Sequence, residues 1–256
     1  MSKIEAAFAK GKAFIGFLTA GDPTLEKTEE FILSMTEAGA DLIEIGIPFS
    51  DPIAEGEVIQ RANVRALSVN TTLDRIFGMV KGIRLKTQIP IVFLTYLNPV
   101  FTYGYDHFFR ECGSSGVDGV IIPDIPYEEK GELTPFSEKY GIDMISLIAP
   151  TSRERIEKIA GSAQGYIYCV SSMGVTGVRN EIKTDLSSIL SDIRAATNVP
   201  TAVGFGISTP EQAAQISTYA DGIIVGSAIV KIIEKYGNDA AKHLYEYVFS
   251  MKKAMA

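Results

Sequence analysis

The stretch Ile91-Val92-Phe93-Leu94 contains only β-branched, aromatic and aliphatic residues. A strand with one face in water alternates apolar and polar residues, whereas a parallel strand covered by helices on both faces is apolar throughout. This run therefore predicts a strand of a parallel sheet. Because parallel strands are joined by crossover connections, helices are expected on either side of it.

Similar short runs recur along the whole chain, and their first residues lie 21 to 49 residues apart. Each interval is long enough for a helix and its loops. The expected strands are Phe14–Leu18, Leu42–Ile47, Ile91–Tyr96, Gly119–Pro123, Asp143–Ile148, Tyr166–Val170, Thr201–Val203 and Gly222–Val225.

The intervals between these runs have helical periodicity. In Leu25–Ala38, for example, Phe31, Ile32 and Met35 share one face, and Gly39 follows as a stop signal. The other expected helices are Ser2–Ala9, Val58–Ser68, Leu73–Lys86, Arg153–Ala160 and one that begins at Pro210.

Eight strands alternating with helices predict the α/β class and a single (β/α)8 barrel, a TIM barrel, with Ser2–Ala9 as an extra N-terminal helix. A doubly wound open sheet is the structural alternative. The sequence contains no Ser/Gly linker and no low-complexity tract. Residues 1–256 are therefore expected to form one domain.

Composition excludes several classes of protein. The 256 residues carry 24 basic and 31 acidic side chains, and the net charge of −7 argues against nucleic acid or anionic membrane as a partner. No apolar run reaches the roughly 18 residues of a membrane helix. Two cysteines, Cys112 and Cys169, suit a reducing, cytoplasmic setting. The two histidines, His107 and His243, lie far apart, so no metal site is expected.

Glu44 is the polar residue that strand patterning explains least. In Leu42–Ile47 the three isoleucines share one face, and Glu44 lies on the other. If the isoleucines pack beneath helices, Glu44 points into the top of the barrel, where burial would raise its pKa. A carboxyl group with a raised pKa suits a general acid or base. A glutamate paired with a lysine or arginine elsewhere in the chain is the alternative.

Other features follow the carboxyl ends of the expected strands, where barrels of this type carry their sites. The loop 48–57 is rich in polar and turn residues, which suits either a site-lining loop or a solvated one. Tyr96 and Tyr168 end two strands and could wall a flat apolar pocket or belong to the core. Glycines at the late strand ends suit binding of a phosphate ester, and tight turns without a ligand are the alternative. These glycine segments are Gly174-Val175-Thr176-Gly177, Gly204-Phe205-Gly206 and Gly226-Ser227.

Taken together, these motifs resemble the α subunit of tryptophan synthase from Phe14 to roughly Val248. The most specific motif is Pro48-Phe49-Ser50-Asp51-Pro52, directly after the strand that carries Glu44. The other matching motifs are Leu18-Thr19-Ala20-Gly21-Asp22-Pro23, Tyr96-Leu97-Asn98-Pro99, Pro123-Asp124-Ile125-Pro126 and the first two glycine segments.

The resemblance implies a (β/α)8 barrel that splits indole-3-glycerol phosphate into indole and glyceraldehyde 3-phosphate, with no metal and no cofactor on this subunit. It also implies a role for each matching residue. Glu44 matches the general acid/base, and Glu55 matches a carboxylate that accepts the indole N–H. The positions that match the substrate site are Phe17, Leu94, Tyr96, Phe205 and Ile224 around the indole, Tyr168 beside the catalytic pair, Gly177, Gly206, Gly226 and Ser227 around the phosphate, and Thr176, which orders the closed site.

The resemblance further implies a partner, a β subunit that carries pyridoxal phosphate, in an α2β2 heterotetramer. Asp51, Pro52, Asn98 and Asp124 are expected to face that subunit. One departure is notable, because the family usually has aspartate at the position of Glu55. The longer side chain reaches one methylene further, so the loop backbone would have to retract to keep the carboxylate in place.

Three alternatives remain from the sequence. One is a stand-alone indole-releasing lyase, which would be active without a partner. Another is a ligand-binding subunit that activates the β subunit while Glu55 has weakened its own chemistry. A third is a different phosphate-binding barrel, although a Schiff-base aldolase would need a lysine within a strand, and none of the expected strands contains one.

Overall fold

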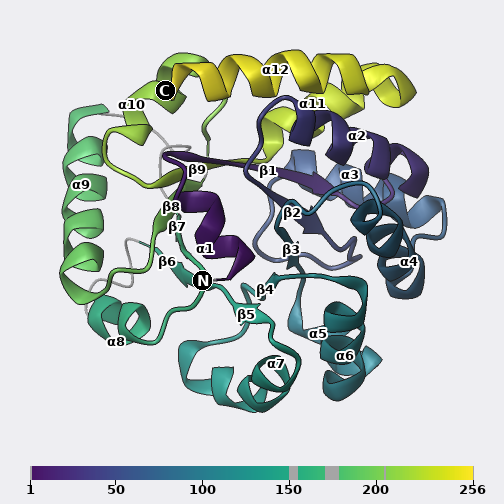
Figure 1. Cartoon of the computed structure of the whole chain (residues 1–256), viewed down its shortest axis with the longest axis horizontal. Helices are drawn as coiled ribbons and strands as arrows, with labels where there is room; N and C mark the ends of the chain where they lie inside the picture. The colour runs from purple at the N-terminus through teal and green to yellow at the C-terminus, as the bar shows by residue number, and fades with distance from the viewer. Residues whose placement is uncertain (1, 150–154, 171–178, 205, 256) are drawn as a thin grey trace.

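The computed structural model describes residues 2–149, 155–170, 179–204 and 206–255, and in these residues nine parallel strands form one sheet. The order across the sheet is β5-β4-β3-β2-β1-β9-β8-β7-β6, and Ile145 alone separates the two end strands along the chain. The sheet therefore closes into a barrel surrounded by helices (Figure 1). The strands are β1 (Ala13–Thr19), β2 (Leu42–Gly46), β3 (Ile91–Leu94), β4 (Gly119–Ile121), β5 (Asp143–Met144), β6 (Ser146–Ile148), β7 (Ile167–Val170), β8 (Thr201–Gly204) and β9 (Gly222–Val225).

The closed barrel confirms the expected fold, with one difference in the fifth strand. The expected strand Asp143–Ile148 is two strands, because Met144 pairs with β4 and Ser146 pairs with β7. At this change of neighbour, the Lys130 ammonium group donates hydrogen bonds to the Met144 carbonyl (2.9 Å) and the Ser146 hydroxyl (3.1 Å). The lysine thus bonds polar groups on both sides of the break.

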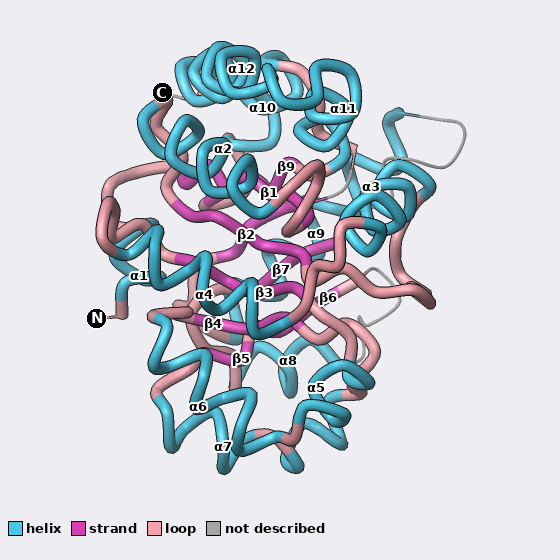
Figure 2. Tube along the Cα trace, turned by 90° about the vertical axis from the view of Figure 1, so that its right-hand side faces the viewer, coloured by secondary structure: helices cyan, strands magenta, loops and turns pink. Residues whose placement is uncertain are grey.

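Helices follow the strands and cover the outside of the barrel (Figure 2). Most expected helices are present within about two residues of their predicted ends, although residues 153 and 154 of one lie outside the described ranges. The helices are α1 (Lys3–Phe8), α2 (Leu25–Glu37), α3 (Glu57–Ser68), α4 (Leu73–Arg84), α5 (Leu97–Tyr103), α6 (Tyr105–Ser115), η1 (Tyr127–Glu132), α7 (Thr134–Tyr140), α8 (Ile156–Gly161), α9 (Arg179–Ala196), α10 (Pro210–Ser217), α11 (Ser227–Tyr236), η3 (Gly237–Asp239) and α12 (Ala240–Ala254).

Capping residues define where some of these helices begin. The Thr209 hydroxyl accepts a hydrogen bond from the Gln212 amide before α10, and Gln212 bonds back to the Thr209 N–H. Pro210 occupies the first turn, where its missing N–H leaves no hydrogen bond unmade. Ser2 and Glu5 form the same reciprocal pair at the start of α1.

The alternation in β2 separates two apolar cores. Ile43, Ile45 and Ile47 pack outward among the surrounding helices, whereas Leu42 lies in the barrel interior. Both cores are built from buried and partly buried side chains, so the described part of the barrel interior is packed.

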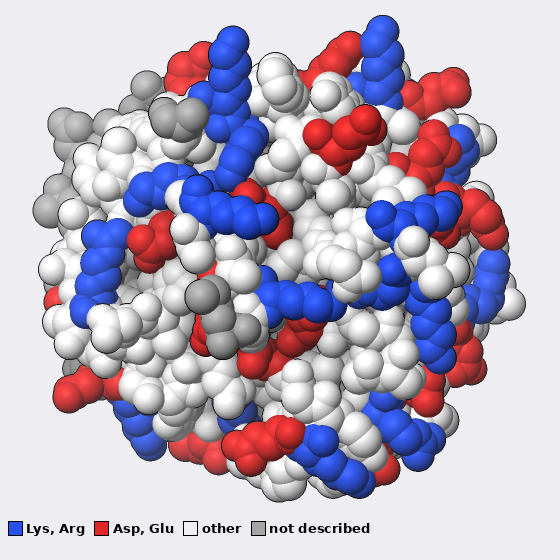
Figure 3. Space-filling view, viewed as in Figure 1, with Lys and Arg blue, Asp and Glu red and all other residues white. Residues whose placement is uncertain are grey.

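Helix α1 closes one end of the barrel, on the face turned toward the viewer in Figure 1. Its Ile4 is fully buried in the interior core, and it packs against Gly119 and Gly165, where β4 starts and just before β7. The amino ends of the strands are therefore covered. Lysine and arginine side chains are interspersed with acidic ones over this face (Figure 3). The opposite end of the barrel is formed by the loops that follow the strands.

Candidate active site

Glu44 lies inside the barrel on β2, as the alternation predicts, and is only 1% exposed. Burial raises the pKa of its carboxyl group to about 7, because the charged form loses its hydration. The Tyr166 hydroxyl donates a hydrogen bond to Glu44 Oε1 at 2.5 Å. Among the described residues no lysine or arginine pairs with Glu44, so its partner is a phenol and not a buried cation.

Tyr166 is a site residue that the sequence reasoning missed. The expected strand begins with it, and the structure buries it completely just before β7, with its ring 5.7 Å from that of Phe8 on α1. A signal was present, because Tyr166 and Tyr168 are two residues apart and therefore share a strand face. Its hydrogen bond lowers the pKa of Glu44, against the larger effect of burial.

Glu55 lies in the loop after β2 and is half-buried. The Asn63 side chain on α3 donates a hydrogen bond from Nδ2 to Glu55 Oε2 at 2.7 Å. Burial raises the pKa of Glu55, while the contacts with Asn63 and the Tyr96 hydroxyl lower it. Asn63 was also missed by the sequence reasoning, although it is a polar residue on the otherwise apolar buried face of α3.

Tyr96 connects the loop to the end of β3. It is 1% exposed, and its hydroxyl accepts a hydrogen bond from the Ala54 N–H at 3.0 Å. Its ring also lies 5.4 Å from that of Phe49. The loop is therefore fixed to the barrel at Phe49 and Ala54, while Asp51 and Ile53 are exposed. It combines a site-facing part with a solvated part, so both interpretations of the sequence apply to it.

Apolar residues expected around a flat ring gather in the same region. Leu94, Tyr168 and Ile224 pack in the interior core, and Leu94 also joins Phe17 in a cluster with α3 and α11. The ring of Phe17 lies so close to Gly46 that a Cβ atom there would come within 2.7 Å of it. The structure therefore brings four of the expected wall residues together beside Glu44, while Phe205 lies outside the described residues.

The expected phosphate-binding residues can be placed at two strand ends. Gly206, after β8, has a φ angle of +82°, which glycine adopts without strain. Gly226 precedes α11, and Ser227 is the exposed first residue of that ten-residue helix. A helix N-terminus presents unpaired N–H groups and a positive dipole end, both of which suit a phosphate. Thr176 and Gly177 lie outside the described residues.

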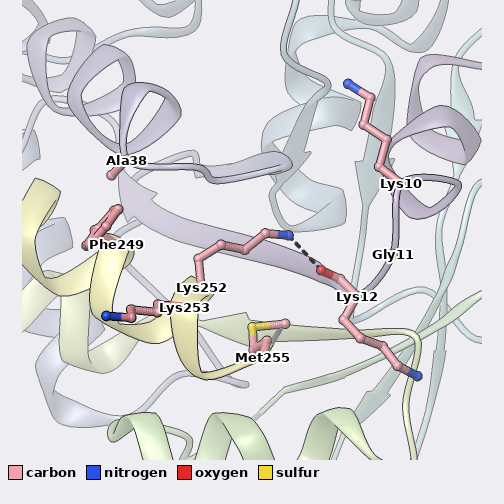
Figure 4. Close-up of a pocket in the computed structure, with 8 residues that line it drawn as sticks. All are labelled: Lys10, Gly11, Lys12, Ala38, Phe249, Lys252, Lys253 and Met255. Atoms are coloured by element: carbon pink, nitrogen blue, oxygen red, sulfur yellow. Dashed lines mark hydrogen bonds between the residues drawn. The ribbon is translucent and has the colours of Figure 1, made fainter.

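A separate pocket of about 680 Å³ opens at the amino end of the barrel, beside the residues that precede β1 (Figure 4). Its four lysines do not converge, because Lys252 is directed to the Lys12 carbonyl at 2.7 Å and the others point apart. The lining residues are Lys10, Gly11, Lys12, Ala38, Phe249, Lys252, Lys253 and Met255.

The geometry combines a buried carboxyl group with a raised pKa, a second carboxylate, a cluster of apolar side chains and a helix N-terminus. The family model described as tryptophan synthase alpha chain matches residues 4–256. The chain belongs to the tryptophan synthase alpha chain family.

Similar proteins span nearly the whole chain. The tryptophan synthase alpha chain of Lacticaseibacillus casei is 49% identical over 255 residues, covering 100% of this chain and 96% of that protein. A crystal structure of tryptophan synthase subunit alpha from Legionella pneumophila str. Paris has a TM-score of 0.91 at 37% identity, covering 100% and 98%. A structure of the tryptophan synthase α2β2 complex from Pyrococcus furiosus has a TM-score of 0.88 at 38% identity, covering 95% and 98%.

The residues expected to face a tryptophan synthase β subunit lie in the segments that follow three adjacent strands, β2, β3 and β4, with Asn98 in the first turn of α5. Asp51 and Asn98 are exposed, whereas Pro52 is half-buried. The Asp124 carboxylate accepts the Leu97 N–H at 2.9 and 3.2 Å, and so holds the start of α5. Asp124 thus has a structural contact in this member of the tryptophan synthase family.

Two kinds of feature are absent from the described residues: a metal-binding cluster and a membrane-spanning helix. In the described ranges, no group of three or more histidine, cysteine, aspartate or glutamate side chains could hold a metal ion. The helices within the same ranges include none that is long and apolar enough to cross a membrane.

Proposed function

We propose that this chain cleaves indole-3-glycerol phosphate at the end of its barrel formed by the loops that follow the strands, with Glu44 as the general acid. The observation that carries the proposal is a buried carboxyl group whose pKa of about 7 keeps a large protonated fraction near neutral pH. The reaction is that of the tryptophan synthase alpha chain, a carbon–carbon lyase.

Glu44 delivers a proton to C3 of the indole ring and forms an indolenine. The bond from C3 to the glycerol phosphate chain then breaks, its electron pair returns to the ring, and the neighbouring hydroxyl of the chain loses its proton as it becomes the aldehyde. The products are indole and glyceraldehyde 3-phosphate. The Glu44 carboxylate left by the first step accepts the proton that this hydroxyl loses, and so returns to its starting form.

In this proposal Glu55 accepts a hydrogen bond from the indole N–H. Positive charge develops on the ring nitrogen when C3 is protonated, and a fixed carboxylate beside it stabilises that charge. The apolar wall of Phe17, Leu94, Tyr168 and Ile224 would hold the indole ring. Gly206, Gly226 and Ser227 would hold the phosphate together with Gly177, and Thr176 would order the closed site. Tyr96 and Phe205 would complete the ring pocket.

We further infer that a β subunit docks on the segments after β2, β3 and β4 that carry Asp51, Pro52, Asn98 and Asp124, in an α2β2 assembly. The Pyrococcus furiosus relative is described in such a complex. The β subunit would carry the pyridoxal phosphate and receive the indole, so this chain needs no cofactor of its own. The buried free thiols of Cys112 and Cys169 suit a reducing, cytoplasmic compartment.

Indole release from indole-3-glycerol phosphate tests the proposal, measured with the purified chain alone and with a β subunit added. Weak activity that rises strongly with the β subunit is the expected result. High activity without a partner would instead identify a stand-alone lyase. Binding of substrate with no turnover in either state would overturn the catalytic proposal and leave a ligand-binding subunit.

Replacing Tyr166 by phenylalanine should change the pH dependence of the reaction. The lost hydrogen bond favours the charged form of Glu44, so its removal raises the pKa of Glu44 above 7. Because Glu44 acts as an acid, we expect the high-pH limb of kcat to move upward. Tyr168→Phe is the matched control and should leave that limb in place. A Tyr166→Phe profile identical to that of the unmodified chain would contradict the assigned contact.

A further inference from the structure

Asn63 is a polar side chain in an apolar place. It is 3% exposed on the face of α3 that also buries Ile59, Ala62 and Ala66. A buried amide costs free energy unless its hydrogen bonds are made. Its Nδ2 group donates to Glu55 Oε2 at 2.7 Å, within the usual range of a charge-assisted hydrogen bond. The contact thus links the buried side of α3 to the loop carboxylate.

Helix α3 is itself held firmly by ion pairs. Arg65 binds Asp22 through two hydrogen bonds of 2.8 Å, one from Nε and one from Nη2, and Asp22 is 1% exposed. On the other side, Arg61 and Arg65 both contact Glu234 on α11. Two-point pairs of this kind fix direction as well as distance. Asn63 therefore projects from a helix with a defined position.

Glu55 is held to the same helix at its backbone. The Gln60 side chain donates from Nε2 to the Glu55 carbonyl at 2.8 Å. Both the main chain and the carboxylate of Glu55 thus bind α3. An added methylene would otherwise let the carboxylate reach further into the ring pocket than an aspartate does.

We propose that Asn63 is a positioning residue that draws the Glu55 carboxylate back toward α3 and so sets it at the distance the indole N–H requires. This inference rests on the proposed role of Glu55. Asn63 binds Oε2 of Glu55, and the Tyr96 hydroxyl also contacts this carboxylate. It acts only through Glu55.

The hydrogen bond from Asn63 also favours the ionised form of the Glu55 carboxyl group. The titratable group facing Glu55 is the Tyr96 hydroxyl at the end of β3, and Asp124 lies beyond that tyrosine. Within the described residues no charged side chain shifts the pKa of Glu55. Asn63 and Tyr96 thus supply the contacts that favour its ionised form, so loss of Asn63 would raise the pKa of Glu55.

Steady-state kinetics of Asn63→Ala test the proposal. We expect kcat to fall about 10- to 100-fold through misplacement of the carboxylate by about an ångström. KM should change less than kcat, because Asn63 does not touch the substrate. The low-pH limb of kcat/KM should move upward, because Glu55 acts in its ionised form. A purely structural role would not move that limb.

Two further variants keep the result interpretable. Val64→Ala, on the exposed side of the same helix, is the control for altered helix stability and should leave the kinetics unchanged. Asn63→Leu keeps the branched shape and the number of heavy atoms of the side chain without a donor, and it should reproduce the kinetic change even if Asn63→Ala folds poorly. Unchanged kcat and an unmoved low-pH limb in a folded variant would overturn the proposal. Absence of indole release from the unmodified chain would instead overturn the proposed function.

Discussion

Glu44→Gln is expected to lower kcat for indole release by about 1,000-fold, within the range that a positioned acid contributes. Glutamine has the same shape but no proton to give to C3. The Tyr166 hydroxyl can donate to the amide oxygen as it does to the carboxylate, so the interior packing should persist. The loss then reports on proton transfer and not on folding.

Indole release in the presence of the β subunit is the measurement, with circular dichroism to check folding. Titration calorimetry on the variant should still detect binding of indole-3-glycerol phosphate, because the wall and the phosphate cradle are untouched. If Glu44→Gln kept more than about a tenth of the activity, Glu44 could not be the general acid.

Glu55→Gln is expected to lower kcat/KM about 100-fold, comparable to the loss of one fixed electrostatic partner of a transition state. The neutral amide cannot balance the charge that develops on the ring nitrogen. Its oxygen can still accept the Asn63 hydrogen bond, so the loop should keep its place. The rates of cleavage by the two proteins, measured under single-turnover conditions, isolate the chemical step.

Glu55→Asp is the matched variant, because it retains the charge and shortens the reach. It restores the residue that the family usually has, but it withdraws the carboxylate from the position that Asn63 holds. We expect a smaller loss than for glutamine, about 10-fold. Equal activity in all three proteins would show that Glu55 takes no part in the reaction.

The strand pattern correctly predicted that Glu44 lies inside the barrel, for a physical reason. Alternation in Leu42–Ile47 is strict, so burial of the isoleucines beneath helices leaves Glu44 only the barrel interior. The repeat of strands and helices likewise predicted the barrel, because crossover connections leave few ways to arrange parallel strands.

The contacts between distant segments could not be predicted in the same way. Tyr166 bonds Glu44 across 122 residues of sequence, and no local pattern encodes that pairing. The break between β5 and β6 at Ile145 could not be predicted from the sequence for a related reason. Ile145 and Leu147 both face the interior, so the alternation is continuous while the neighbouring strand changes from β4 to β7.

The sequence also did not predict which residue holds the Glu55 carboxylate. The departure from aspartate implied that the loop backbone retracts, but not which side chain holds the carboxylate. Asn63 lies eight residues further along the chain, and only the fold turns its amide toward the loop. Roles for Thr176, Gly177 and Phe205 depend on residues outside the described ranges and remain predictions.

The closing helix α1 has a consequence for how the chain is made. Ile4 and Phe8 are synthesised long before Gly165 and Tyr166, yet Ile4 lies against Gly165, and the ring of Phe8 lies near that of Tyr166. At a synthesis rate of about 5 to 20 residues per second, α1 must wait roughly 8 to 30 s for those partners. The same late residue completes the hydrogen bond to Glu44. A newly made chain therefore cannot complete this end of the barrel, or the hydrogen bond to Glu44, before Tyr166 has been synthesised.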